Sequence, residues 1–182
     1  AWSFDESPTV DAAFMRPAIE RAIAYRAGVV VRHTDASRLV HGECDALPGL
    51  VVDRYADTAV MQCSSTGAEY WREAYADALI DSGVCRRVYE RSDAETRNLE
   101  GLAPRWGSVR GDEPPDAVRV HEEGLQFLVD VREGQKTGFF IDQRDNRARV
   151  GSLARGRDVL DVFCYTGGFV LAALAGRAGG GG

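Results

Sequence analysis

The sequence has no long hydrophobic run, no cysteine pair with metal-ligand spacing and no excess of basic residues. Its apolar runs extend over only a few residues, which is too short to span a bilayer. The four cysteines are widely separated, include no Cys-x-x-Cys pair and have no metal-ligand spacing to the three histidines. No basic and then apolar leader opens the sequence. We therefore expect reduced thiols, no metal site, no membrane partner and a cytoplasmic location.

The formal net charge of −6 argues against a nucleic-acid surface that extends over the whole chain. The charge is unevenly distributed, however, because residues 132–157 contain seven basic and three acidic side chains, a local charge of +4. Two interpretations stay open. The basic residues form either a solvated helix face with compensating ion pairs or a local rim that holds RNA phosphates.

The composition is that of a globular protein with one or two domains, since 45% of its 182 residues are hydrophobic and 27% are charged. Helical periodicity predicts helices over residues 12–27, 66–82 and 94–99, the last capped by Ser92 or Asp93. Strand patterns cover residues 39–43, 50–55, 59–64, 84–90, 106–110, 117–121 and 125–131, and a short apolar run covers 29–31. Pro48-Gly49 fits the centre of a type II turn. These mixed elements predict an α+β domain.

The C-terminal part has a different pattern. An apolar run at residues 159–163 predicts a buried strand, followed by a tight turn at 164–168 and a helix from 169 to about 177. Such a strand–turn–helix unit places backbone N–H groups where open α/β sheets bind cofactors. Only Gly167 and Gly168 lie in the turn, so the dinucleotide fingerprint is absent. Because four glycines end the chain after one such unit, we expect a truncated domain.

Two blocks resemble a known family. They are Gly-Gln-Lys-Thr-Gly-Phe-Phe-Ile-Asp-Gln-Arg-Asp-Asn-Arg at residues 134–147 and Asp-Val-Phe-Cys-Tyr-Thr-Gly-Gly-Phe at 161–169. In this order they resemble the class I, S-adenosylmethionine (SAM)-dependent cytosine-C5 methyltransferases of large-subunit (23S) ribosomal RNA. Residues 41–55 resemble a block in the middle domain of the same family. The resemblance implies an α+β central domain at 1–130 on the RNA side. The start of an α/β Rossmann-like SAM-methyltransferase domain then follows at 131–182, and the chain is truncated at both ends.

The resemblance also implies a set of SAM-binding residues. Asp161 resembles the acidic residue that ends the first strand in this class, and small residues in the turn would let the backbone approach the methionine end of SAM. Residues 136–144 would form a lid or wall, with Gln143 and Arg144 bonding the methionine carboxylate. Alternatively, Asp142 caps a helix and residues 139–141 are core. The predicted cofactor-binding residues are Lys136, Thr137, Phe140, Gln143, Arg144, Asp161, Phe163, Tyr165, Thr166, Gly167 and Gly168.

Family members, by resemblance, add a cysteine thiolate to C6 of cytosine and then methylate C5. The motifs that carry that cysteine lie downstream of Gly182 in the family, so this fragment is predicted to be inactive on its own. Cys164 is predicted to be a small buried residue and not the nucleophile. The implied partner is large-subunit ribosomal RNA, and a homodimer is possible. The alternatives are a ribosomal RNA guanine-N7 methyltransferase of the same superfamily and a non-catalytic RNA-binding module.

Overall fold

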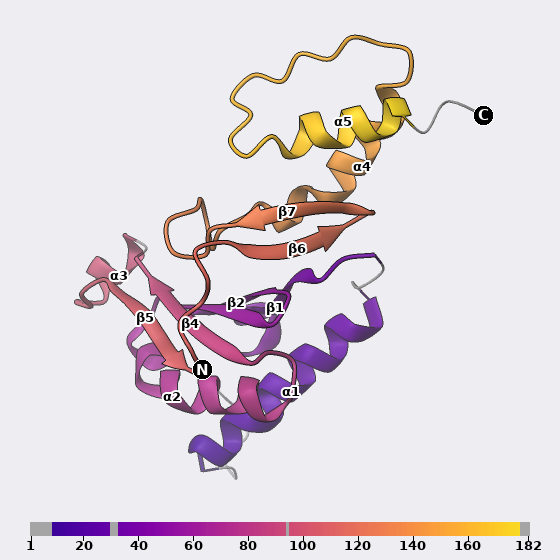
Figure 1. Ribbon diagram of the computed structural model, residues 1–182. Coiled ribbons are helices and arrows are strands. Elements are labelled where there is room, and N and C mark those ends of the chain that lie inside the picture. The colour runs from indigo at the N-terminus through magenta and orange to yellow at the C-terminus, as the bar shows by residue number, and fades with distance from the viewer. Residues whose placement is uncertain (1–8, 30–32, 94, 179–182) are drawn as a thin grey trace.

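The centre of the structure, a computed structural model that describes residues 9–29, 33–93 and 95–178, is a five-stranded mixed sheet (Figure 1). Its strands neighbour one another in chain order, and only β3 and β4 are parallel. Parallel neighbours need a crossover connection, which α2 (Thr66–Asp81) supplies. The strands are β1 (Ala36–His41), β2 (Leu50–Tyr55), β3 (Thr58–Cys63), β4 (Arg87–Ser92) and β5 (Arg105–Arg110).

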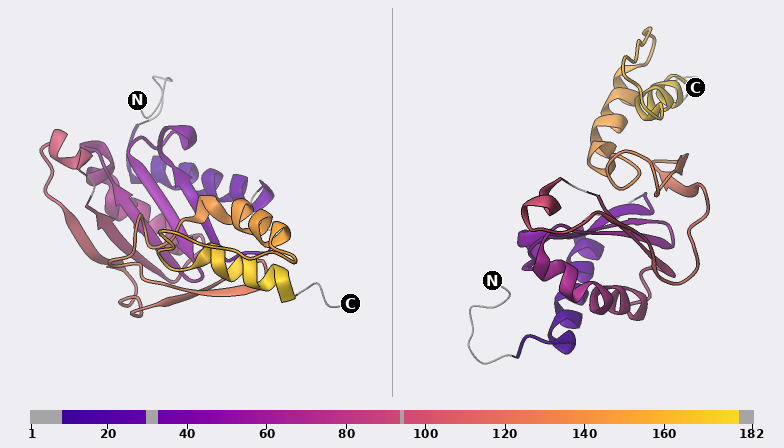
Figure 2. Two further views of the ribbon diagram at one scale, coloured as in Figure 1. Left: turned by 90° about the horizontal axis from the view of Figure 1, so that it is seen from above. Right: turned by 90° about the vertical axis from the view of Figure 1, so that its left-hand side faces the viewer.

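Each face of this sheet is covered by a different layer (Figures 1 and 2). Helices α1 (Ala12–Val29) and α2 cover one face, and a buried apolar cluster that includes Ile19, Met61 and Leu79 fills the space between them. The opposite face packs Tyr55 and Val60 against the hairpin of β6 (Val118–Glu122) and β7 (Leu125–Val129). Two short helical turns, η1 (Gly42–Asp45) and α3 (Thr96–Leu99), lie in the connections.

The predicted turn at Pro48-Gly49 is confirmed. The N–H of Leu50 donates to the carbonyl of Leu47 at 3.1 Å, and Gly49 has a φ of +74°. A Cβ atom at Gly49 would lie 2.3 Å from Oγ of Ser65, the residue that caps α2. Glycine is therefore required here both by the backbone conformation and by the close approach of the helix cap.

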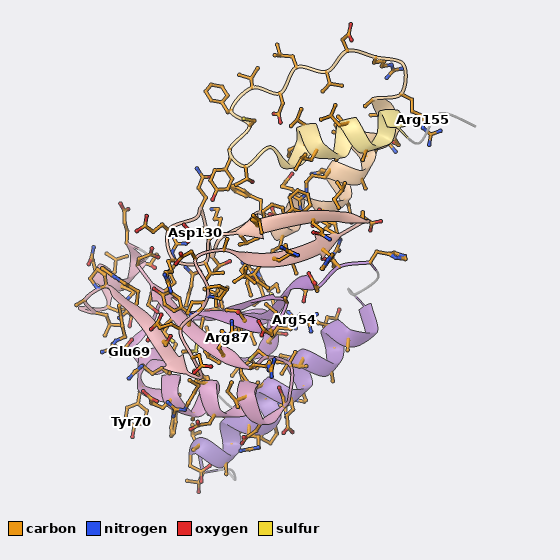
Figure 3. All side chains as sticks on the ribbon, in the orientation of Figure 1. Arg54, Glu69, Tyr70, Arg87, Asp130 and Arg155 are labelled. Carbon is orange, nitrogen blue, oxygen red and sulfur yellow. The ribbon has the colours of Figure 1, made fainter. Side chains whose placement is uncertain are left out.

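Beyond the hairpin lie η2 (Ile141–Gln143), α4 (Arg144–Leu153) and α5 (Gly168–Ala178) (Figure 2). The two helices approach so closely that a Cβ on Gly176 would lie 1.9 Å from the carbonyl oxygen of Gly151. Figure 3 shows Arg155 just after α4, beside α5. The predicted helix after residue 168 is confirmed.

The predicted strand at residues 159–163 is wrong. This segment has no strand conformation, and the exposed fractions of Leu160 and Phe163 are 86% and 98%. A strand needs a neighbour to accept its backbone hydrogen bonds, and the described part of the chain places no strand beside this run.

Cys164 was predicted to be buried but is exposed. The apolar run that leads into it has no sheet to enter, so the turn that contains Cys164 is not covered by another layer.

Two smaller predictions also differ from the structure. Helix α3 begins only at Thr96 and has no side-chain cap; the Ser92 hydroxyl lies in β4 and donates to Glu90 instead, at 2.7 Å. Of the apolar run at 29–31, Val29 ends α1, and the other two residues lie outside the described ranges.

The chain is thus a mixed α/β protein. The order of a central domain and a Rossmann-like domain, and the boundary between residues 130 and 131, stay predictions. Within the described ranges, no helix has the length and apolar character needed to cross a membrane.

Candidate functional site

The segment between β7 and α4, residues 134–144 and called the ribbon below, runs close over the end of the hairpin. Asp130, labelled in Figure 3, organises the turn that leads into the ribbon. Its carboxylate accepts hydrogen bonds from the N–H groups of Arg132 and Glu133, at 2.9 and 3.0 Å. A Cβ on Gly138 would lie 2.7 Å from Cγ1 of Val129, so only glycine fits where the ribbon crosses β7.

Thr137 fastens the ribbon to the central sheet. Its buried hydroxyl donates to Oδ2 of Asp53 at 2.6 Å and lies 2.7 Å from the hydroxyl of Tyr55, which also accepts from the N–H of Phe139 at 3.2 Å. Burial and the neighbouring Asp53 raise the pKa of Tyr55, so it stays a neutral hydrogen-bonding group. Asp53 is also held by Arg38 through two hydrogen bonds, at 2.8 and 2.9 Å.

The bend at residues 161–168 faces the ribbon. The N–H of Gln135 donates to the Tyr165 hydroxyl at 2.7 Å, and the rings of Phe140 and Tyr165 meet edge to face, with their centroids 6.0 Å apart. The bend contains Phe163 and Tyr165 at positive φ, of 62° and 51°, as well as Gly167 at 74°. Aromatic residues rarely adopt this conformation, and such strain is concentrated at ligand-binding turns.

Between the ribbon and the bend lies a cavity of about 470 Å³, called the first hollow below. It is formed by the two sequence blocks that were predicted to come together. The predicted residues that line it are Lys136, Phe140, Gln143, Asp161, Phe163, Tyr165, Thr166 and Gly168.

Three predicted residues do not line the first hollow. Thr137 is turned towards the sheet, as described above, and Gly167 lies within the turn, where its N–H donates to the carbonyl of Cys164 at 2.8 Å. Arg144 lines a different hollow. The expectation that Asp142 caps the following helix is wrong, because Gln143 occupies the cap position of α4 without a side-chain hydrogen bond.

The lining of the first hollow includes one unsatisfied polar atom. Oδ2 of Asp161 is buried and has no hydrogen-bond partner among the described residues. A buried carboxylate oxygen without a donor is unfavourable, since its desolvation is not compensated. An ammonium or hydroxyl group of a ligand in this cavity would satisfy it, and the methionine end of SAM carries such an ammonium.

Arg147 is a lining residue that the sequence interpretation did not single out. It forms a buried two-point ion pair with Glu122 at 2.6 and 2.7 Å, its Nη1 donates to the carbonyl of Phe140 at 2.9 Å, and its guanidinium lies 4.4 Å from the centre of the Phe139 ring. A Cβ on Gly168 would lie 3.1 Å from its Cδ. Arg147 thus joins the hairpin, the ribbon and the start of α5. In the sequence, Arg147 stands out only as the second arginine of the Asp-Gln-Arg-Asp-Asn-Arg block and as one of the seven basic residues at 132–157.

Some basic side chains of the stretch at 132–157 form ion pairs with acidic residues, and others are exposed. Arg147 is buried against Glu122, and Arg132 pairs with Asp116 at 3.1 Å, whereas Arg149 is exposed. No cluster of three or more potential metal-ligating side chains occurs in the described ranges.

The chain is similar in sequence and in fold to known methyltransferases. A family profile described as S-adenosylmethionine-dependent methyltransferase matches residues 96–180. A protein of Shewanella frigidimarina named ribosomal RNA large subunit methyltransferase I is 45% identical over 179 residues, which are 97% of this chain and 45% of that protein.

Two solved structures share the fold. A candidate SAM-dependent methyltransferase from Streptococcus mutans superposes with a TM-score of 0.78 at 23% identity, covering 94% of this chain and 44% of that one. A candidate methyltransferase in complex with S-adenosylhomocysteine (SAH) gives 0.79 at 23% identity, covering 94% and 43%. By sequence, the chain is therefore similar over 97% of its length to the ribosomal RNA large subunit methyltransferase I proteins, and it spans about 45% of the length of the relatives it matches.

Proposed function

We propose that this chain is part of a methyltransferase that moves a methyl group from SAM to carbon 5 of a cytosine in large-subunit ribosomal RNA. The observation that carries the proposal is the first hollow, in which the two family blocks meet around an unsatisfied Asp161 oxygen. The relatives that match 97% of the chain are named ribosomal RNA large subunit methyltransferase I. An RNA substrate also favours the cytoplasm as the location.

The residues of the first hollow fit the parts of the cofactor. Oδ2 of Asp161 would accept from the methionine ammonium, and the backbone around Thr166 and Gly168 would lie against the methionine end. The aromatic rings of Phe140 and Tyr165, already in contact, would cover the cavity and exclude water. When bound, SAM supplies a methyl group on a positively charged sulfur.

The work of this chain is positional. Methyl transfer needs donor, methyl and acceptor held in line at close approach, and correct placement alone lowers the barrier substantially. The ribbon is suited to this task because two contacts fix it: Thr137 donates to Asp53, and Arg147, itself paired with Glu122, donates to the carbonyl of Phe140. The groups that activate the cytosine are proposed to lie in sequence beyond residue 182, and the division into domains at residues 130 and 131 is part of the same proposal.

The direct test is isothermal calorimetry with SAH on the intact gene product, including any sequence that flanks these 182 residues. We expect binding that Asp161→Asn weakens by about tenfold or more, since a charge-assisted hydrogen bond is lost. Asp112→Asn, at an exposed position that does not line this hollow, is the control and should bind normally. No heat with the wild-type protein would refute the proposal.

The substrate is tested separately, by methyl transfer from radiolabelled SAM to in vitro transcribed large-subunit ribosomal RNA. Digestion to nucleosides then identifies the product. We expect 5-methylcytidine; 7-methylguanosine would show that the guanine-N7 alternative is correct. Sedimentation of the same protein tests whether it is a monomer or a homodimer.

A further inference from the structure

A second hollow, of about 710 Å³, adjoins the ribbon on the side of the central sheet. Strands β1, β2 and β3 and the helix α1 contribute to its lining, and the ribbon contributes Lys136, Phe139 and Asp142 to both hollows. The ribbon is therefore a common wall. Whatever occupies the second hollow lies next to the proposed cofactor site.

The second hollow has a basic lining. Two of its arginines already have partners, because Arg26 is paired with Asp45 at 2.7 Å and Arg38 is held by Asp53. Within each pair the positive and negative charges cancel. The carboxylates that line the hollow are Asp53, which is engaged by Arg38 and Thr137, and Asp142, whose carboxylate accepts from the Gln143 amide at 3.1 Å.

Arg144 is different from these paired arginines. Its Nη1 is buried and has no hydrogen-bond partner among the described residues, and its ion-pair contact is a single one, from Nε to Asp145 at 3.4 Å. Lys136 is exposed beside it on the same wall. A guanidinium with an unsatisfied donor in a basic hollow is suited to bind an anion, and a phosphate offers the matching oxygens.

We propose that the second hollow binds a backbone phosphate of the RNA substrate and that Arg144 donates the hydrogen bond to it. This inference rests on the proposed function. It revises the prediction that Arg144 bonds the methionine carboxylate, because Arg144 lines the second hollow and not the first. A phosphate held here would place the RNA strand across the ribbon, with neighbouring bases beside the first hollow.

The test uses two variants of α4 in the intact gene product. Arg144→Gln removes the proposed phosphate ligand, and Arg149→Gln removes an equal charge from an exposed position that lines neither hollow. Affinity for in vitro transcribed large-subunit ribosomal RNA is measured by filter binding at several salt concentrations, and affinity for SAH by calorimetry.

We expect Arg144→Gln to weaken RNA binding about tenfold and to reduce the slope of log K against log salt by about 0.7 to 0.9, the value for one phosphate contact. SAH affinity should change less than about twofold, and Arg149→Gln should leave the salt slope unchanged. Arg144→Lys should restore part of the slope, because the charge returns without the forked geometry.

Two outcomes would overturn the inference. If Arg144→Gln weakens SAH binding and spares RNA binding, Arg144 belongs to the cofactor site. If both variants affect RNA equally, the contribution is one of general charge and not of a built site. Failure of the wild-type protein to bind SAH would instead refute the proposed function, so the two failures are distinguishable.

Discussion

Strand β2 and the segment 159–163 have similar sequences and opposite structures. Both are Val- and Leu-rich runs interrupted by an aspartate, Leu-Val-Val-Asp-Arg-Tyr in β2 and Val-Leu-Asp-Val-Phe in the later segment. β2 pairs with β1 and β3 and lies between two covering layers, whereas the later run is an exposed loop. Strand formation therefore depends on neighbouring strands and covering layers more than on local composition.

The largest expected effect is at the buried ion pair that joins the hairpin to α4. Glu122→Ala leaves the buried guanidinium of Arg147 without its partner, so we expect the free energy of unfolding to fall by about 3 to 5 kcal/mol. Urea denaturation of the purified chain measures this. Glu133→Ala removes the same charge from an exposed position and should change stability by less than about 0.5 kcal/mol. Equal effects would show that the ion pair does not stabilise the contact between the hairpin and α4.

Truncating one leucine in β2 and one in residues 159–163 tests how deeply each segment is packed. Leu50 is fully buried, so Leu50→Ala should cost about 2 to 5 kcal/mol through lost burial and the cavity left behind. Leu160 is 86% exposed, and Leu160→Ala should stay within about 0.5 kcal/mol. The denaturation midpoints of the two variants of the 182-residue chain, compared with that of the unmodified chain, measure these changes in stability. A large loss from Leu160→Ala would mean that the segment is packed after all.

Two helix glycines, Gly176 in α5 and Gly28 in α1, differ in how closely other atoms approach them. Gly176→Ala would drive a Cβ into the Gly151 carbonyl, so we expect a loss of about 1 to 2 kcal/mol as α4 and α5 separate. Gly28→Ala, in α1, meets nothing within 4 Å and should gain about 0.5 to 1 kcal/mol from helix propensity. Thermal unfolding followed by circular dichroism measures both, and the same sign for both would contradict the close helix contact.

The smallest effect concerns the thiols. Cys44 and Cys164 are exposed, and Cys63 and Cys85 are buried. We expect two rapid equivalents with a thiol-specific disulfide reagent at neutral pH and two more only after unfolding. Four rapid equivalents would show that the core opens readily.

The same thiols predict an alkaline pH dependence. Burial raises the pKa of Cys85 to about 11, above its ordinary value of 9.0. The folded chain therefore keeps a proton that the unfolded chain has lost, so this contribution to stability is present below pH 9 and is lost as the pH rises towards 11. Cys85→Ala should flatten this part of the stability profile.

Much of the fold was predictable because its signals are local. The turn at Pro48-Gly49, the helix that ends before Gly83 and the hairpin strands follow from residue type and spacing, and the structure has them at nearly the predicted bounds. The absence of a side-chain cap on α3 was not predictable. The Ser92 hydroxyl instead donates to Glu90 and accepts from the N–H of Cys63 on the neighbouring strand.

The site, like the fold, was predictable in part. The meeting of ribbon and bend, with eight lining residues, followed from the two motif blocks and their order. The sequence could not show which way each side chain points. Thr137 faces Asp53, and Arg144 faces the second hollow, because the ribbon alternates between two neighbours that lie far from it in the sequence.

The common wall has a thermodynamic consequence. Lys136, Phe139 and Asp142 border both hollows, so a ligand that shifts them on one side changes the binding free energy on the other. Linkage makes that coupling reciprocal: the factor by which a ligand in one hollow alters the affinity of the other hollow is the same in both directions. Each hollow would therefore respond to the occupant of the other through three shared side chains.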